Sequence, residues 1–149
     1  MAHTPNRSIG LFWLFFSPFG RASRQAYWLG LALVLVISFI TLNIAAGPIL
    51  EAMAHSSFNE IAVDQFLSEI MKQNQLLPYL MFVENWVLLA LVIKRIQDRG
   101  WSGFLALLTF LPFVNFAVYL FMGLQPSQSG ANRYGPEPNS KPLQRSPRK

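Results

Sequence analysis

The feature that most constrains this chain is an uncharged apolar run over residues 27–46. A helix needs about 20 predominantly apolar residues to cross the hydrocarbon core of a bilayer, and this run is long enough. A helix on the surface of a soluble domain also needs a polar face, and no charged residue in the run supplies one. The run therefore predicts a membrane-spanning helix that ends at Gly47-Pro48, where glycine and proline can stop it.

Two further apolar blocks follow, at residues 76–93 and 101–124. The first is just long enough to span but carries Glu84 and Asn85 near its middle, where polar groups are costly. The second has Pro112 near its centre, so it either spans with a kink or breaks into two halves that return to the same side. The sequence thus predicts an all-α membrane protein with three transmembrane helices, the third alternatively a proline-broken re-entrant hairpin.

Composition supports a membrane protein, because 52% of the 149 residues are hydrophobic and only 13% are charged. Soluble domains carry about 25% charged residues. The net charge of +5 comes from Lys and Arg gathered at segment ends rather than on one face, which argues against nucleic acid as a partner. With no cysteine and two histidines far apart in sequence, we expect neither a metal site nor a cofactor.

The segments outside the spans differ in character. Residues 1–26 form a leader, whose aromatic-rich block at 9–19 is too short to span and suits the headgroup boundary. A signal peptide is the alternative, but the block lacks a small-x-small cleavage site. Residues 58–74 have apolar side chains at helical spacing and predict an amphipathic loop helix. Residues 125–138 predict an ordered polar turn motif, and residues 139–149 predict a disordered basic tail.

Basic residues near the spans predict the orientation of the membrane domain, residues 27–124, because Lys and Arg are held on the cytoplasmic side. The leader and the turn at 94–99 are basic and belong inside, whereas the acidic first loop fits the outside. We therefore expect a multi-pass protein with a cytoplasmic N-terminus. Three crossings would put the C-terminal tail outside, and a re-entrant third block would return it to the cytoplasm.

Three polar clusters stand out against this apolar background. The first, residues 20–28, places Arg21 and Arg24 directly before the first span, where a guanidinium group can bind lipid phosphate. The alternative interpretation is a topology signal with interfacial anchors. The third, residues 130–138, frames Arg133 and Tyr134 with glycines and prolines, so it predicts an ordered turn that covers a helix end or holds a headgroup.

The second cluster, residues 94–103, predicts a rigid cytoplasmic turn. Asp98 can pair with Lys94 or Arg95 one helical turn earlier, and Gly100 can end the helix in the left-handed conformation. The serine that follows, at position 102, is placed to cap the next helix. A catalytic or proton-relay site is the alternative, but no nucleophile, base or metal ligand lies nearby in the sequence.

Glu84 and Asn85 carry a separate question, because an ionisable group at membrane depth is by default a functional hypothesis. Glu84 either joins helices through a hydrogen bond to Asn43, Asn115 or a second copy, or it lines an ion path. No second acid lies in any predicted span to continue a relay. The sequence therefore favours the joining role.

In this order around apolar segments, the three clusters resemble a bacterial inner-membrane family known as domain of unknown function eight hundred and five. Its members typically show G-R-x-S-R-x-x-Y/F-W before the first span, R-R-x-H-D-x-G-x-S-G-W before the last, and N-R/x-Y-G-x-D-P after it. The matching segments here are 20–28, 95–104 and 132–138. The resemblance implies a location in the bacterial inner (cytoplasmic) membrane and no established activity.

The chain departs from these patterns at four positions, which are Lys94 for arginine, Gln97 for histidine, Phe104 for tryptophan and Glu137 for aspartate. Glutamine at position 97 makes a metal or proton-transfer role there doubtful.

We expect a non-enzymatic protein that binds anionic lipid headgroups or a membrane partner, with a homo-oligomer as one form of partner. The alternative is an oligomeric small transporter or channel with Glu84 in its path. The candidate lipid- or partner-binding residues are Arg21, Arg24, Arg95, Arg99 and Arg133. The candidate structural residues are Asp98, Gly100, Ser102, Gly103, Asn132, Tyr134 and Gly135, and the intramembrane polar residues are Glu84 and Asn85.

Overall fold

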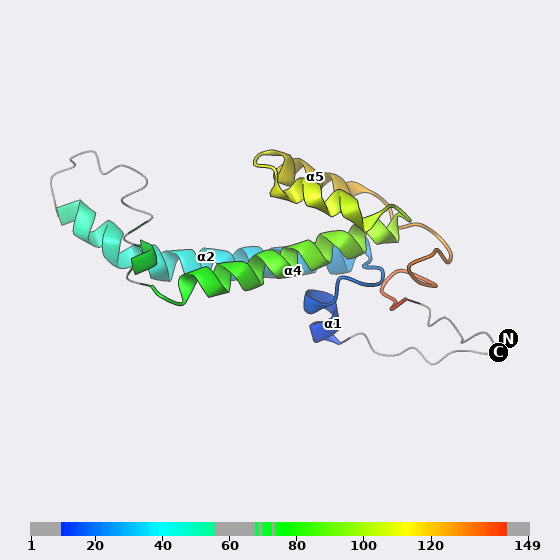
Figure 1. The fold of residues 1–149 in the computed structure, drawn as a ribbon, viewed down its shortest axis with the longest axis horizontal. Helices are drawn as coiled ribbons and strands as arrows, with labels where there is room; N and C mark the ends of the chain where they lie inside the picture. The colour runs from blue at the N-terminus through cyan, green and yellow to red at the C-terminus, as the bar shows by residue number, and fades with distance from the viewer. Residues whose placement is uncertain (1–9, 56–67, 69, 73, 143–149) are drawn as a thin grey trace. The chain divides into compact units, whose positions relative to one another are not determined.

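The structure is a computed structural model that describes residues 10–55, 68, 70–72 and 74–142. Its helices are α1 (Leu11–Phe16), α2 (Arg24–His55), α4 (Leu77–Asp98), the 3₁₀ helix η1 (Gly103–Phe110) and α5 (Val114–Leu124) (Figure 1). Within those residues, β-structure is limited to two isolated bridges, Arg21 with Ser140 and Asn132 with Gly135. The prediction of an all-α protein is confirmed.

The chain forms two compact units. The larger one combines Met1–Leu31 with Trp86–Lys149, and the smaller one is Ala32–Asn85. Helices α2 and α4 each begin in one unit and end in the other. All three polar clusters belong to the larger unit.

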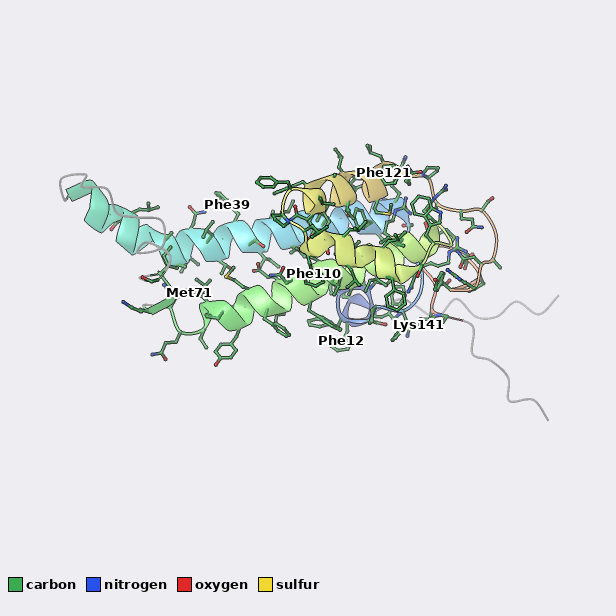
Figure 2. All side chains as sticks on the ribbon, turned by 45° about the horizontal axis from the view of Figure 1, so that its top comes forward. Phe12, Phe39, Met71, Phe110, Phe121 and Lys141 are labelled. Atoms are coloured by element: carbon green, nitrogen blue, oxygen red, sulfur yellow. The ribbon has the colours of Figure 1, made fainter. Side chains whose placement is uncertain are left out.

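Helices α2 and α4 contain the segments that are long and apolar enough to cross a membrane, Arg24–Gly47 and Leu77–Asp98. Only 28% and 33% of their most apolar windows are buried within the protein, whereas the core helix of a soluble domain is mostly buried. Large side chains such as Phe39, labelled in Figure 2, are left exposed on α2. Hydrocarbon is the solvent in which such a surface is stable.

The predicted end of the first helix at Gly47-Pro48 is wrong, because α2 continues to His55. Proline removes one backbone donor and bends a helix, but the hydrogen bonds on either side of it can still form. The predicted second helix, 76–93, agrees with the start of α4, which continues to Asp98 through the first part of the second polar cluster.

The third apolar block is not one helix. It is divided into η1 and α5 by a turn over residues 111–113, where Phe113 has a φ of 67°. Pro112 lies in this turn and cannot donate a backbone hydrogen bond, which explains the break. The two pieces pack against each other, and Figure 1 shows the chain reversing direction between them. A single third spanning helix is therefore not formed.

The smaller unit has an apolar core of Ala45, Ala46, Ile70 and Leu77. The side chain of Asn74 holds the end of this unit together, since Nδ2 donates to the carbonyls of Ala45 (3.3 Å) and Ile70 (3.1 Å). Of the amphipathic helix predicted over 58–74, residues 68 and 70–72 are helical, and most of the rest lies outside the described residues.

Candidate functional site

Two arginines in the larger unit share one carboxylate. Arg21 Nε lies 3.0 Å from Asp98 Oδ1, and Arg95 Nη1 lies 2.5 Å from Asp98 Oδ2. All three side chains are fully buried, with 0% exposure. We call these three residues the arginine–aspartate cluster. The sequence predicted the local contact of Asp98 with Arg95 as one option, but not the contact with Arg21.

Backbone carbonyls take up the remaining donors of Arg21. Its Nη1 donates to the carbonyls of Gly130 (2.6 Å) and Gly135 (3.2 Å), and its Nη2 donates to that of Gln128 (2.6 Å). A buried ion pair is stable only when its remaining donors and acceptors are satisfied. The segment after α5 thus completes the environment of an arginine from the leader.

Arg95 covers the C-terminal end of α5 in the same way. Its Nε donates to the carbonyl of Met122 (3.0 Å), Nη2 donates to that of Gln125, and Nη1 donates to Ser127 Oγ (3.1 Å). The last carbonyls of a helix lack intrahelical partners and carry the negative end of the helix dipole, so a cation is favoured there. Trp28 adds a further bond from Nε1 to the carbonyl of Gly123 (3.0 Å).

The turn after α4 has a defined backbone form. Gly100 has a φ of +74° and donates to the carbonyl of Gln97 (2.9 Å), while Trp101 donates to that of Ile96 (3.2 Å). This pair of bonds is the Schellman arrangement that ends helices at a glycine. Ser102 stands at the N-cap of η1, but its side chain forms no cap hydrogen bond, so the predicted cap is not made.

The polar turn motif folds back on the leader. Asn132 and Gly135 exchange backbone hydrogen bonds of 3.0 and 3.2 Å, and Asn132 Nδ2 reaches the carbonyl of Gln97 (3.0 Å). Arg21 N donates to the carbonyl of Ser140 (2.9 Å). Ser23 N donates to the side-chain oxygen of Asn139, the residue before Ser140 (2.8 Å). The ordered motif therefore extends past the boundary predicted at 138, and residues 143–149 lie outside the described part.

Lys94 does not pair with Asp98, the other option from the sequence. Its Nζ donates to the carbonyls of Trp13 (2.9 Å) and Leu14 and lies 4.7 Å from the centre of the Trp13 ring. A lysine on α4 thus caps the end of α1, and Trp86 Nε1 adds a bond to the carbonyl of Phe16 (3.1 Å). Nothing in the spacing of the sequence indicated this long-range contact.

The three polar clusters of the sequence therefore meet in one place. A family model described as "Protein of unknown function (DUF805)" matches residues 15–136, a stretch that contains almost all of them. The chain belongs to this DUF805 family.

Relatives of this DUF805 chain are known in bacteria. It is 32% identical over 119 residues to "Inner membrane protein YhaI" of Escherichia coli strain K12, covering 80% of the chain and 83% of the relative. It is 25% identical over 123 residues to "Inner membrane protein YhaH" of the same strain, covering 83% and 88%. No solved structure matches the chain.

The arginines proposed as headgroup ligands fall into two groups in this DUF805 chain. Arg21 and Arg95 are buried with donors directed at protein oxygens, so direct headgroup contact by these two is contradicted. Arg24 and Arg133 are exposed, and Arg99 is partly exposed. Arg24 and Arg99 both lie close enough to Arg95 to repel its charge, so they belong to one positive region.

Glu84 accepts a hydrogen bond from Ser38 Oγ at 2.6 Å, within the smaller unit. The predicted partners have other bonds: Asn43 Nδ2 donates to the carbonyl of Phe39 (2.7 Å), and Asn115 Oδ1 accepts from Phe116 N (2.8 Å). Asn85 donates to the carbonyl of Met81 (2.7 Å) in its own helix. The geometry agrees with a joining role for Glu84, through a serine rather than an asparagine.

Metal binding finds no support in the part of the DUF805 chain that the structure describes. Over those residues, no group of three or more His, Asp or Glu side chains is arranged to hold an ion.

Proposed function

We propose that this chain is a non-enzymatic inner-membrane protein that binds anionic phospholipid headgroups at the cytoplasmic boundary through Arg24, Arg99 and Arg133. The observation that carries the proposal is the division of the basic residues. Arg21 and Arg95 donate to Asp98 and to backbone carbonyls, whereas the three other arginines keep exposed surface around the arginine–aspartate cluster. The names of the two relatives support the inner-membrane location.

The proposed topology has two spanning helices, α2 and α4, with η1 and α5 forming a re-entrant hairpin. It is supported by the hydrogen bond between Arg21 N and the carbonyl of Ser140 (2.9 Å), because a bilayer cannot separate two bonded residues. The leader and the polar turn motif then lie on one side. The excess of Lys and Arg near the spans favours the cytoplasm for that side.

Helix lengths support the same topology. The 11 residues of α5 extend about 16 Å and the 8 residues of η1 about 16 Å, roughly half of the 30 Å hydrocarbon core. Both pieces return to the end of α4, since Gly103 lies beside Ile93 and the carbonyl of Met122 accepts from Arg95. A hairpin of this depth inserts into one leaflet.

Aromatic side chains accompany the accessible arginines. The guanidinium carbon of Arg133 lies 4.7 Å from the centre of the Tyr134 ring, and that of Arg99 lies 5.9 Å from the Trp101 ring. Tyrosine and tryptophan favour the headgroup level of a bilayer, so these pairs place positive charge where lipid phosphates lie. Each such charge contributes about 1 kcal/mol toward an anionic surface.

The test is lipid retention by the purified full chain. The wild type and an R24Q/R99Q/R133Q variant are extracted in mild detergent from membranes of phosphatidylglycerol and phosphatidylethanolamine, and the co-purified lipids are quantified. We expect the enrichment of phosphatidylglycerol to fall at least tenfold in the variant, since about 3 kcal/mol of attraction is removed.

A matched variant, R24K/R99K/R133K, retains the charges and should retain the enrichment. Unchanged enrichment in the glutamine variant would reject the proposal. So would loss of a co-purifying protein with no change in lipid, since that outcome assigns the arginines to a protein partner.

A further inference from the structure

A groove of about 430 Å³ runs along the larger unit between the leader, α4 and η1. Its apolar walls include Phe19 from the leader, Leu89 and Ile93 from α4, and Leu107 from η1. Leu89, Ile93 and Gln97 follow one another at intervals of one helical turn, so the groove extends about 12 Å along α4. This length is most of the roughly 15 Å of hydrocarbon in one leaflet, so the groove suits the greater part of an acyl chain.

The polar residues of the groove gather at the end of α4 that carries the arginine–aspartate cluster. They are Gln97, Ser102 and Tyr134. Leu89 lies two helical turns further into the apolar part of α4. The groove thus combines a polar mouth with an apolar interior, which is the polarity of a phospholipid.

Only the oxygen of the Gln97 side-chain amide has a hydrogen-bond partner in the described part of the protein. Its Oε1 accepts from Gly20 N at 3.2 Å, but no described residue supplies an acceptor for its Nε2. The side chain is only 6% exposed, and Nε2 points toward Gly103, whose added Cβ would lie 3.3 Å away. Among the described side chains, the buried donor without a partner is Arg99 Nε, so Gln97 Nε2 stays open to the groove and can donate to a ligand that occupies it.

The remaining groups at the mouth also suit an oxygen-rich anion. The hydroxyl of Ser102 makes no cap hydrogen bond and is exposed. Arg133, exposed, stacks at 4.7 Å on the ring of Tyr134, which itself lines the groove. Two uncharged donors, Gln97 and Ser102, therefore line the mouth of the groove, and a cation stacks on Tyr134, a third lining residue.

We infer that the groove holds one acyl chain of an anionic phospholipid, with an ester or phosphate oxygen accepting a hydrogen bond from Gln97 Nε2 and the phosphate facing Arg133. This inference rests on the proposed function, because the same boundary and the same class of lipid are involved. It adds a defined position for a single lipid molecule, distinct from the general attraction exerted by Arg24 and Arg99.

The experiment is native mass spectrometry of the full chain in detergent, titrated with phosphatidylglycerol and, in a parallel arm, phosphatidylethanolamine. The wild type should retain one phosphatidylglycerol molecule at activation energies that remove all other bound lipid molecules. Phosphatidylethanolamine should be retained less than phosphatidylglycerol. Gln97→Glu preserves the acceptor for Gly20 and replaces the free donor with an anion. Leu107→Trp fills the groove from η1. Each variant should retain the single lipid at least tenfold less.

Leu105→Trp is the matched control, since Leu105 lies on the same helix, is similarly exposed and does not line the groove. It should match the wild type within about twofold. Because a core substitution can unfold a protein, thermal unfolding is measured for every variant, and Leu89→Trp supplies a second filling variant from α4.

Equal lipid retention in the wild type, Gln97→Glu and both filling variants would overturn the inference. So would an equal loss in the Leu105→Trp control, or a dimer that phosphatidylglycerol dissociates, which would make a second copy the occupant. An R24Q/R99Q variant distinguishes headgroup binding by the exposed arginines from binding of a single lipid in the groove. If it leaves bulk phosphatidylglycerol enrichment intact while Leu107→Trp removes the single lipid, the arginine-based function fails and the groove stands.

Discussion

Arg21 Nε and Asp98 Oδ1 lie 3.0 Å apart in a fully buried ion pair that joins the leader to the end of α4. Asp98 also holds Arg95, so one carboxylate balances two guanidinium groups, and backbone carbonyls after α5 accept the remaining donors. In such an arrangement the loss of one member leaves a buried charge uncompensated. Substitutions here should cost more stability than any at the exposed arginines.

Asp98→Asn should destabilise the protein by about 3–5 kcal/mol, because it leaves two buried guanidinium groups without an anion. The measurement is thermal or denaturant unfolding of the protein in detergent. Glu137→Gln removes an exposed carboxylate and should change the free energy of unfolding by less than about 0.5 kcal/mol. Similar losses in the two variants would contradict a special role for the cluster.

Arg21→Gln and Arg24→Gln should differ in their effects on proteolysis and on lipid retention, although the two residues are close in sequence. The first removes bonds to Asp98 and to the carbonyls of Gln128 and Gly130, so it should expose the polar turn motif to proteolysis. The second removes an exposed charge and should leave proteolysis unchanged while lowering phosphatidylglycerol retention. Protection of the motif in Arg21→Gln would show that it folds without the leader.

Lys94→Met should release α1 from α4. The ammonium group caps the carbonyls of Trp13 and Leu14, and hydrogen bonds from charged groups contribute about 1.5–3 kcal/mol each. Hydrogen exchange should therefore accelerate at the amides of residues 11–16, with little change at the end of α4. Lys141→Met, at an exposed lysine, is the control. Uniform acceleration over the larger unit would instead indicate global destabilisation.

Gly123→Ala should destabilise the contact between α5 and the start of α2. An added Cβ would lie 2.4 Å from Cζ2 of Trp28, whose Nε1 also donates to the carbonyl of Gly123. Overpacking of this kind costs about 1–3 kcal/mol. Gly10→Ala is a suitable control, since nothing lies within 4 Å of its added Cβ. Trp28 fluorescence and unfolding in detergent report the effect, and an unaltered midpoint would argue against close contact.

The absence of cysteine from the sequence allows the topology to be tested with single introduced thiols. Gln25→Cys and Ser129→Cys should both be protected from a membrane-impermeant maleimide in intact spheroplasts and labelled after lysis. Gln75→Cys, in the loop expected outside, should label in intact spheroplasts. All three positions are exposed in the structure. Labelling of Ser129→Cys but not Gln25→Cys in intact spheroplasts would require a third crossing.

Much of the fold could be predicted because the information is local. The apolar runs identify α2 and α4, Pro112 marks the division of the third block, and Gly100 marks the end of α4. The continuation of α2 past Pro48 was missed, since one proline weakens a helix without always ending it.

The candidate site was less predictable because it depends on long-range contacts. Periodicity reports which residues share a helix face, but not that Arg21 reaches Asp98 or that Lys94 reaches α1. Basic residues at a membrane boundary suggested headgroup binding for Arg21 and Arg95 equally with the others. Only their burial distinguishes the structural arginines from the accessible ones.

The bond between Arg21 and Ser140 has a consequence for biogenesis. Arg21 emerges from the ribosome more than 100 residues before its acceptors at Gln128, Gly130, Gly135 and Ser140. Its charge must stay hydrated or at the lipid surface until those acceptors have been synthesised. Insertion of the spans can therefore precede closure of the larger unit, and a product terminated before Gln128 would lack the carbonyl acceptors of Arg21.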